Sequence, residues 1–185
     1  MRERKRAHSR AATVDAALAL FAARGYAAVT VADICEAAQI APRTFFRYFP
    51  TKEDLLAEPA REMAAHVAAS IAAAPPELDD AEVLRAAMRS LGEHVITHRE
   101  RLAGYFAVAA EASAVRSNPF VRLSDREREL TERLLARRPA PAAADWRTRL
   151  LVARAVAAFR IWLDDAVTAG TPDPLGHLDE VLAAG

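Results

Sequence analysis

Apolar residues recur along this chain at intervals of three and four, the spacing that places them on one face of a helix. In the first segment Val14, Leu18 and Phe21 form such a stripe, and Gly25 follows where a helix can end in a left-handed residue. Two later stripes consist of Leu84, Met88, Leu91 and Val95, and of Leu151, Ala155, Phe159, Trp162 and Ala166. Because alanine is abundant, glycine is sparse and most prolines lie between the stripes, we predict an all-α protein.

Breaks in this pattern divide the 185 residues into about nine helices in two parts. The expected helices cover roughly residues 8–24, 31–38, 42–49, 51–73, 79–97, a following one to 114, 118–137, 143–169 and 174–184. Pro59 lies inside the fourth of them. Since proline has no backbone N–H to donate, we expect a kink or an interruption at that position.

Residues 29–56 carry the most specific local pattern in the chain. Thr30 and Asp33 have the spacing of a capping box, in which each side chain accepts a hydrogen bond from the other's backbone N–H. Thr51 and Asp54 repeat that spacing. The segment therefore predicts two short helices around a tight turn, followed by the capped start of a third helix.

Two short helices joined in this way form a helix-turn-helix, whose second helix enters the major groove of DNA. Arg43 is the best candidate for reading a base, because a guanidinium can pair with O6 and N7 of guanine together. Hydroxyl groups, and a lysine at a helix N-terminus, suit phosphate oxygens. The predicted DNA-binding residues are Thr30, Pro42, Arg43, Thr44, Arg47, Tyr48 and Lys52. Phe45 and Phe49 are expected to pack on the first helix. The alternative is a helical hairpin whose polar side only faces solvent.

This segment resembles the DNA-binding domain of the TetR family of bacterial transcriptional regulators. The family's Thr-capped helix, A-G-V-S-like turn, T-[LF]-[YF]-x-[YH]-F run and K-[ED]-x-L run correspond to Thr30 and to residues 38–41, 44–49 and 52–55. The resemblance implies a three-helix DNA-binding domain over residues 1–52 and an effector-binding and dimerisation bundle over residues 53–185. It also implies a dimeric repressor that binds an inverted-repeat operator and is released by a small molecule.

Three residues depart from the family pattern. Gln39 replaces the usual turn glycine, so a non-glycine residue is expected to adopt a left-handed conformation. Ala41 replaces a serine and removes an N-cap hydroxyl from the second helix. Phe46 replaces a common tyrosine, so one phosphate contact of the family is expected to be lost.

Charge is unevenly distributed although the formal net charge is zero. Residues 1–53 hold nine Lys/Arg against five Asp/Glu, whereas the remainder holds 16 against 20. A basic N-terminal part fits contact with nucleic acid. The single cysteine, Cys35, fits a reducing cytoplasm, and no apolar run reaches the length of a membrane span. We therefore expect a cytoplasmic protein without membrane contact.

The sequence patterns in the C-terminal part of the chain are less specific. Residues 143–169 are apolar on more than one side, which indicates either a helix at a homodimer interface or the central helix of a monomeric bundle. With the resemblance, we expect a homodimer formed through the last two long helices. A small, mostly apolar effector is expected against some of ten residues, each of which can equally be plain core. These are Met63, His66, Met88, Leu91, Val95, Tyr105, Phe106, Phe120, Phe159 and Trp162.

Other function classes have weaker support. His94 and His98 have the i, i+4 spacing of two metal ligands, but no recognised ligand pattern accompanies them. The paired Glu-x-x-His motifs of a di-metal bundle enzyme, glycine-rich phosphate loops and nucleophile elbows do not occur. We therefore predict no enzyme activity, no catalytic residue, no metal and no cofactor. A protein-interaction module without DNA binding stays open, but it leaves Arg43, Arg47 and Lys52 unexplained.

Overall fold

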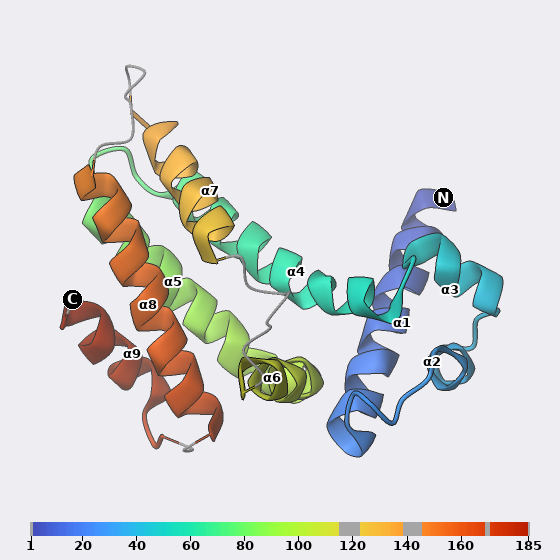
Figure 1. Ribbon diagram of the computed structural model, residues 1–185. Helices are drawn as coiled ribbons and strands as arrows, with labels where there is room; N and C mark the ends of the chain where they lie inside the picture. Colours follow the sequence, from blue (N-terminus) through green and yellow to red (C-terminus); the bar gives the residue numbers. More distant parts are fainter. Residues whose placement is uncertain (1, 115–122, 139–145, 169–170, 185) are drawn as a thin grey trace. The chain divides into compact units, whose positions relative to one another are not determined.

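The computed structural model describes residues 2–114, 123–138, 146–168 and 171–184. Within these ranges the chain forms helices and no strand, so the predicted all-α fold is confirmed (Figure 1). The helices are α1 (Arg2–Arg24), α2 (Val31–Ala37), α3 (Pro42–Tyr48), α4 (Lys52–Ala73), α5 (Asp80–Thr97), α6 (Arg99–Ala114), α7 (Leu123–Leu135), α8 (Trp146–Thr168) and α9 (Pro174–Ala183).

The start of α1 and the continuity of α4 can be compared with the sequence-based expectations. α1 begins at Arg2, earlier than predicted, because the basic start of the chain holds neither glycine nor proline to break a helix. α4 runs through Pro59 without interruption, so of the two expected outcomes only a kink stays a prediction. The expected starts of the helices at residues 118 and 143 lie outside the described residues.

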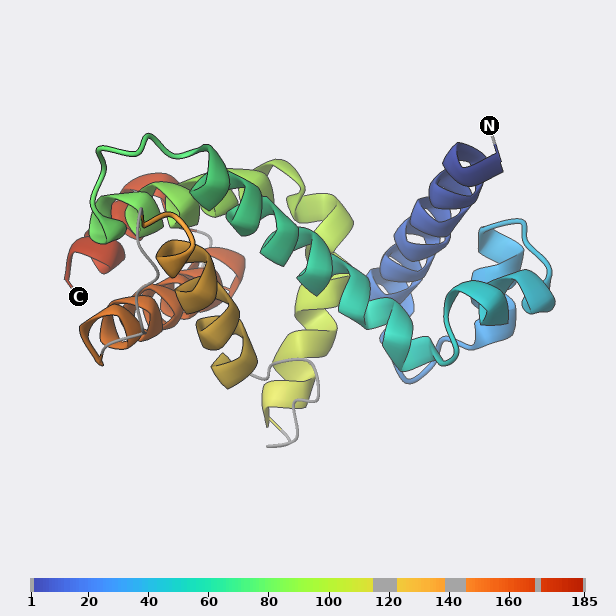
Figure 2. The same cartoon turned by 90° about the horizontal axis from the view of Figure 1, so that it is seen from above.

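The helices group into two compact units, and α4 is divided between them. Unit 1 holds α1, α2, α3, the part of α4 up to Glu62, and α6. Its largest fully buried side chains include Leu18, Phe21, Ile34, Phe45 and Phe49. α1 packs against both α2 and α6, and α2 and α3 form a short hairpin beside α1 (Figure 2).

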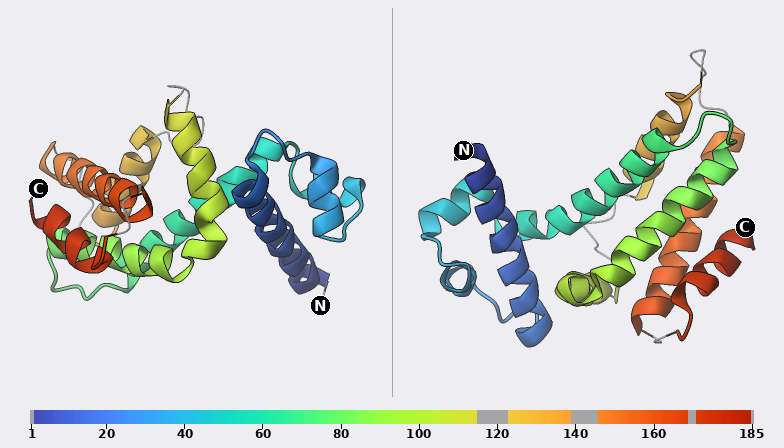
Figure 3. Two further views of the ribbon diagram at one scale, coloured as in Figure 1. Left: turned by 90° about the horizontal axis from the view of Figure 1, so that it is seen from below. Right: turned by 180° about the vertical axis from the view of Figure 1, so that it is seen from behind.

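Unit 2 holds α4 from Met63 onward, α5, α7, α8 and α9. α5, α8 and α9 pack against one another, and α7 lies on α8 (Figure 3). Trp162 of α8 is completely buried, and its indole N–H donates to the carbonyl of Pro174 at the start of α9. In the described part of the chain, no helix is both long enough and apolar enough to cross a bilayer.

Candidate nucleic-acid interface

Thr30 fixes the start of α2 as the sequence predicts. The Asp33 N–H donates to the Thr30 hydroxyl at 3.2 Å, and the Thr30 N–H donates to the Asp33 carboxylate at 2.7 Å. The Thr30 hydroxyl also donates to the same carboxylate. These bonds from Thr30, with a weaker contribution from Arg24, lower the pKa of Asp33 to about 2. The capping box is therefore complete, and it is made with an ionised Asp33 at neutral pH.

This depressed pKa predicts how unit 1 responds to acid. A carboxyl whose pKa is lower in the folded than in the unfolded state stabilises the fold above its unfolded pKa, about 3.9, and loses that effect as the pH falls through 2. Asp33→Asn is therefore expected to lower stability at pH 6, with a difference from the parent protein that shrinks between about pH 4 and pH 2. Denaturant unfolding across this range measures the difference. A difference that stays constant down to pH 2.5 would contradict the assignment.

The turn between α2 and α3 adopts the expected left-handed conformation. Gln39 has φ = 53°, and among the described residues it is the one non-glycine position with positive φ. The next N–H, that of Ile40, donates to the carbonyl of Cys35 at 2.9 Å and closes the turn. α3 then begins at Pro42, and its N-cap, Ala41, offers no side-chain hydrogen bond. The consequences predicted for Gln39 and Ala41 are therefore both confirmed.

α3 has one buried side and one exposed side. Phe45 and Phe49 are buried with their ring centroids 5.6 Å apart, in line with their predicted core role. Arg43, Phe46 and Arg47 are exposed. At spacings of three and four residues, these three side chains share one face of the helix.

Thr44 and Tyr48 are less exposed than the sequence suggested, since both are half-buried at the edge of this face. The Arg47 guanidinium lies 5.1 Å from the centroid of the Tyr48 ring. A hydrogen bond with Ser9 of α1, helped by Arg47, lowers the pKa of the Tyr48 hydroxyl. Tyr48 therefore joins α3 to α1 as well as bordering the exposed face.

Lys52 has an internal role that the sequence did not indicate. Its ammonium donates to the carbonyls of Tyr26 at 2.9 Å and Val29 at 2.8 Å, and it lies 3.9 Å from the centroid of the Tyr26 ring. The Tyr26 hydroxyl donates to Glu53 at 2.6 Å. Burial and this carboxylate raise the pKa of Tyr26, while the hydrogen bond from Tyr26 lowers the pKa of Glu53. Lys52 thus ties the loop after α1 to the start of α4.

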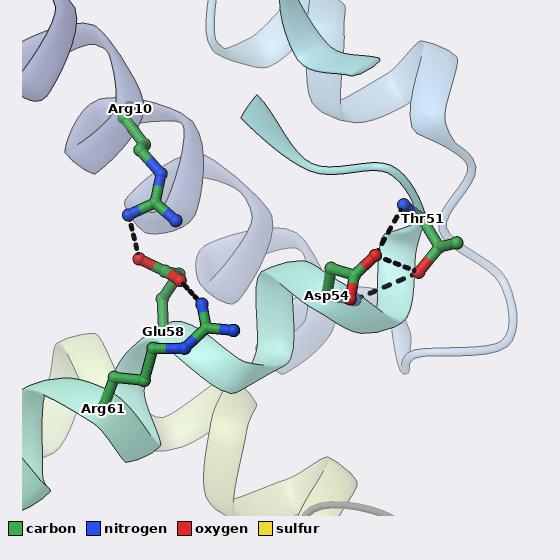
Figure 4. Close-up of polar contacts among 5 residues, drawn as sticks. All are labelled: Arg10, Thr51, Asp54, Glu58 and Arg61. Atoms are coloured by element: carbon green, nitrogen blue, oxygen red, sulfur yellow. Dashed lines mark hydrogen bonds and ion pairs between the residues drawn. The ribbon is translucent and has the colours of Figure 1, made fainter. Parts of the chain in front are cut away.

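A second set of contacts holds the beginning of α4. Thr51 and Asp54 form the predicted capping box, with the Thr51 N–H donating to Asp54 at 3.0 Å (Figure 4). Glu58 lies between Arg10 of α1 and Arg61, and it accepts a hydrogen bond from each (Figure 4). The Arg10 guanidinium also lies 5.0 Å from the centroid of the Phe49 ring. These contacts fix α4 against α1 within unit 1.

The residues expected to contact an effector do not all lie together. Tyr105 and Phe106 belong to unit 1, and Phe120 lies outside the described residues. The other seven belong to unit 2, and most of them are buried core; they are Met63, His66, Met88, Leu91, Val95, Phe159 and Trp162. His66 is the polar exception, because its Nε2 lies 3.0 Å from the Ser90 hydroxyl and its ring centroid lies 4.7 Å from that of His94.

Unit 2 also has an open pocket of about 430 Å³ that none of the expected effector residues lines. Its lining residues are Asp80, Arg138, Trp146, Arg147, Thr148, Leu150, Leu151 and Arg154. Arg138 donates to Asp80 at 2.7 Å and to the Thr148 hydroxyl at 3.0 Å. An apolar stripe identifies buried residues, so it gives no signal for a surface pocket of arginines and an exposed tryptophan.

Comparison with known proteins places this geometry in a family. Residues 14–58 match the family model of the bacterial regulatory proteins of the tetR family. The chain is 44% identical over 59 residues to the HTH-type transcriptional regulator TcmR of Streptomyces glaucescens, a match that spans 32% of this chain and 26% of TcmR. It is 28% identical over 183 residues to MftR of Mycobacterium tuberculosis, named as a transcriptional regulator of mycofactocin biosynthesis, spanning 92% of this chain and 87% of MftR.

The fold of the described residues also agrees with solved structures. A solved structure of RolR in complex with its ligand resorcinol has a TM-score of 0.55 and 25% identity, and it covers 98% of this chain and 89% of RolR. The matched residues 14–58 contain the C-terminal part of α1, all of α2 and α3 and the capped start of α4. Residues 14–58 therefore form a DNA-binding domain of the TetR family of bacterial regulatory proteins, as the helix-turn-helix motif predicts, and the two relatives above are transcriptional regulators rather than enzymes.

Proposed function

We propose that this protein is a ligand-responsive repressor that binds an inverted-repeat operator as a homodimer. The observation that carries the proposal is the division of α3 into two sides. Phe45 and Phe49 anchor the helix in unit 1, while Arg43 and Arg47 project from the opposite, exposed side. A helix held in this way presents both guanidinium groups to a major groove at little further cost in backbone conformational entropy.

The proposed DNA-binding residues have different roles. Arg43 pairs with a guanine edge, and Arg47 contacts the next base or a phosphate. Thr30, Pro42, Thr44 and Tyr48 lie along the phosphate backbone and set the register of α3. Lys52 uses two of its three N–H donors on backbone carbonyls, which leaves one for a phosphate.

The proposed dimer forms through α8 and α9. α8 exposes two large apolar side chains, Leu150 and Ile161, which are 49% and 48% exposed. Burying such residues against a second copy removes apolar area from water. Residues 1–52 would then form the DNA-binding domain of each copy and residues 53–185 the effector-binding and dimerisation domain. Two recognition helices on one operator multiply the affinity of each.

The proposed effector is a small, mostly apolar molecule that binds in the C-terminal bundle. Support comes from RolR, a protein of the same fold whose structure holds resorcinol. α4 is the helix that both units share, so a ligand that favours one arrangement of α4 shifts the population of operator-competent dimers. This regulation takes place in the cytoplasm, where the protein meets DNA.

Selection from a random duplex pool tests the DNA-binding part of the proposal. Purified protein is incubated with the pool at moderate salt, and bound duplexes are sequenced. Enrichment of an inverted repeat supports sequence-specific binding by a two-fold assembly. A folded protein that enriches no sequence would instead support a helical interaction module.

Arg43→Ala is the matched variant for this experiment. Because Arg43 is exposed, the substitution is expected to leave folding unchanged and to weaken operator binding by about 1–3 kcal/mol. The loss should be confined to the operator, with random duplex bound as before, and titration of both duplexes measures it. An equal loss on the two duplexes would assign Arg43 to phosphate contact rather than to base reading.

A further inference from the structure

Phe46 occupies a position that folding does not explain. It is 53% exposed, although its neighbour Phe45 is fully buried and the two ring centroids are only 5.4 Å apart. Exposure of a large aromatic side chain forgoes the stabilisation that burial provides. Phenylalanine in place of the family's tyrosine lacks the hydroxyl, and in the structure its apolar ring is exposed to solvent.

The surroundings of Phe46 indicate what the ring can contact. Arg43 lies three residues before it and Arg47 directly after it, and all three side chains project from the exposed face of α3. The exposed face of α3 therefore presents the aromatic ring of Phe46 with a guanidinium group on either side. In the major groove, the apolar group that a base pair presents is the C5-methyl of thymine, and phenylalanine is one of the side chains that contact it.

We propose that Phe46 reads the C5-methyl group of a thymine beside the base that Arg43 reads. The assignment rests on the proposed DNA-binding function and adds a specificity to it. Docking buries part of the exposed ring against the methyl group, whereas cytosine, which has no methyl, leaves the ring in contact with water. One buried methyl group corresponds to about a three- to fivefold change in affinity.

Deoxyuridine provides the sharpest test, because it differs from thymidine only by the missing methyl group. Each thymine of the selected operator is replaced in turn by deoxyuridine, and binding is titrated for the parent protein and for Phe46→Ala. At one thymine in each half-site, we expect the replacement to weaken the parent about three- to fivefold and to leave Phe46→Ala unchanged. Phe46→Leu, which keeps an apolar side chain, is the matched control and should retain part of the sensitivity.

The outcomes separate this assignment from the proposed function. If the parent and Phe46→Ala respond equally to every replacement, Phe46 does not read a methyl group, while sequence-specific binding through Arg43 stands. An operator that has no thymine near the base read by Arg43 would likewise show that Phe46 does not read a methyl group. If selection enriches no sequence, the proposed function fails, and the assignment of Phe46 fails with it. Because Phe46 is exposed, circular dichroism is expected to show that Phe46→Ala folds like the parent.

Discussion

Phe45→Ala is expected to lower the free energy of unfolding by about 3–5 kcal/mol, the range for removing a buried phenylalanine ring. Phe45 is completely buried, and its ring packs beside Phe49 in the part of unit 1 that holds α3. Truncation removes the apolar contacts of the ring and leaves a cavity that a short helix can fill only partly. Since small domains are marginally stable, a loss of this size also reduces the population able to bind DNA.

The neighbouring residue supplies the control. Phe46→Ala removes the same side chain from the exposed face of α3, so it forfeits little more than the edge contact with Phe45, about 0.5–1.5 kcal/mol. Denaturant unfolding of both variants measures the two losses under the same conditions. Equal losses would show that the two rings are buried alike and would contradict the division of α3 into a core side and a DNA side.

The features of unit 1 that could be predicted from sequence depend on neighbouring residues. The capping boxes of Thr30 and Thr51 each connect residues three apart, and the left-handed Gln39 lies within a short turn. Such features depend on local backbone geometry, which the residue types at short spacings indicate directly. Periodicity likewise predicts that Phe45 lies inside and Arg43 outside. For these reasons the sequence alone predicts the helix-turn-helix.

The features that could not be predicted join residues far apart in the chain. Lys52 contacts backbone carbonyls 26 and 23 positions earlier, and no local sequence pattern indicates which carbonyls a lysine will contact. The degree to which Phe46 is exposed depends on how unit 1 covers α3, and a run of four aromatic residues within five positions does not set it. The open pocket in unit 2 brings together residues of α5, α8 and the segment after α7.

Gly104 is the clearest long-range feature of this kind. From local sequence, a glycine inside a helix indicates only that the helix is less stable at that position. In α6 it marks the crossing with α1, where a Cβ atom on Gly104 would lie 2.0 Å from the carbonyl oxygen of Leu18. It would also lie 3.0 Å from the backbone N of Ala22. Backbone atoms cannot rotate away as a side chain can. The two helices therefore pack this closely only with glycine at position 104.

Gly104→Ala is accordingly expected to destabilise the protein by about 3 kcal/mol, because α1 and α6 must move apart. Helix propensity alone predicts the opposite sign, since alanine is favoured over glycine by about 1 kcal/mol in a helix interior. Thermal or denaturant unfolding distinguishes the two. A stabilised variant would mean that α1 and α6 do not meet at backbone distance.

Gly92→Ala in α5 is the matched control. There the new Cβ would lie 2.5 Å from Cδ2 of Leu178, the end of a side chain that can change rotamer. We therefore expect a cost of about 1 kcal/mol, clearly below that of Gly104→Ala. Both substitutions add the same methyl group to a buried helix, so the difference between them isolates the rigid backbone of α1 as the cause. α1 also carries Arg10 and Ser9, which contact Phe49 and Tyr48, so a shift of α1 in Gly104→Ala should weaken DNA binding as well.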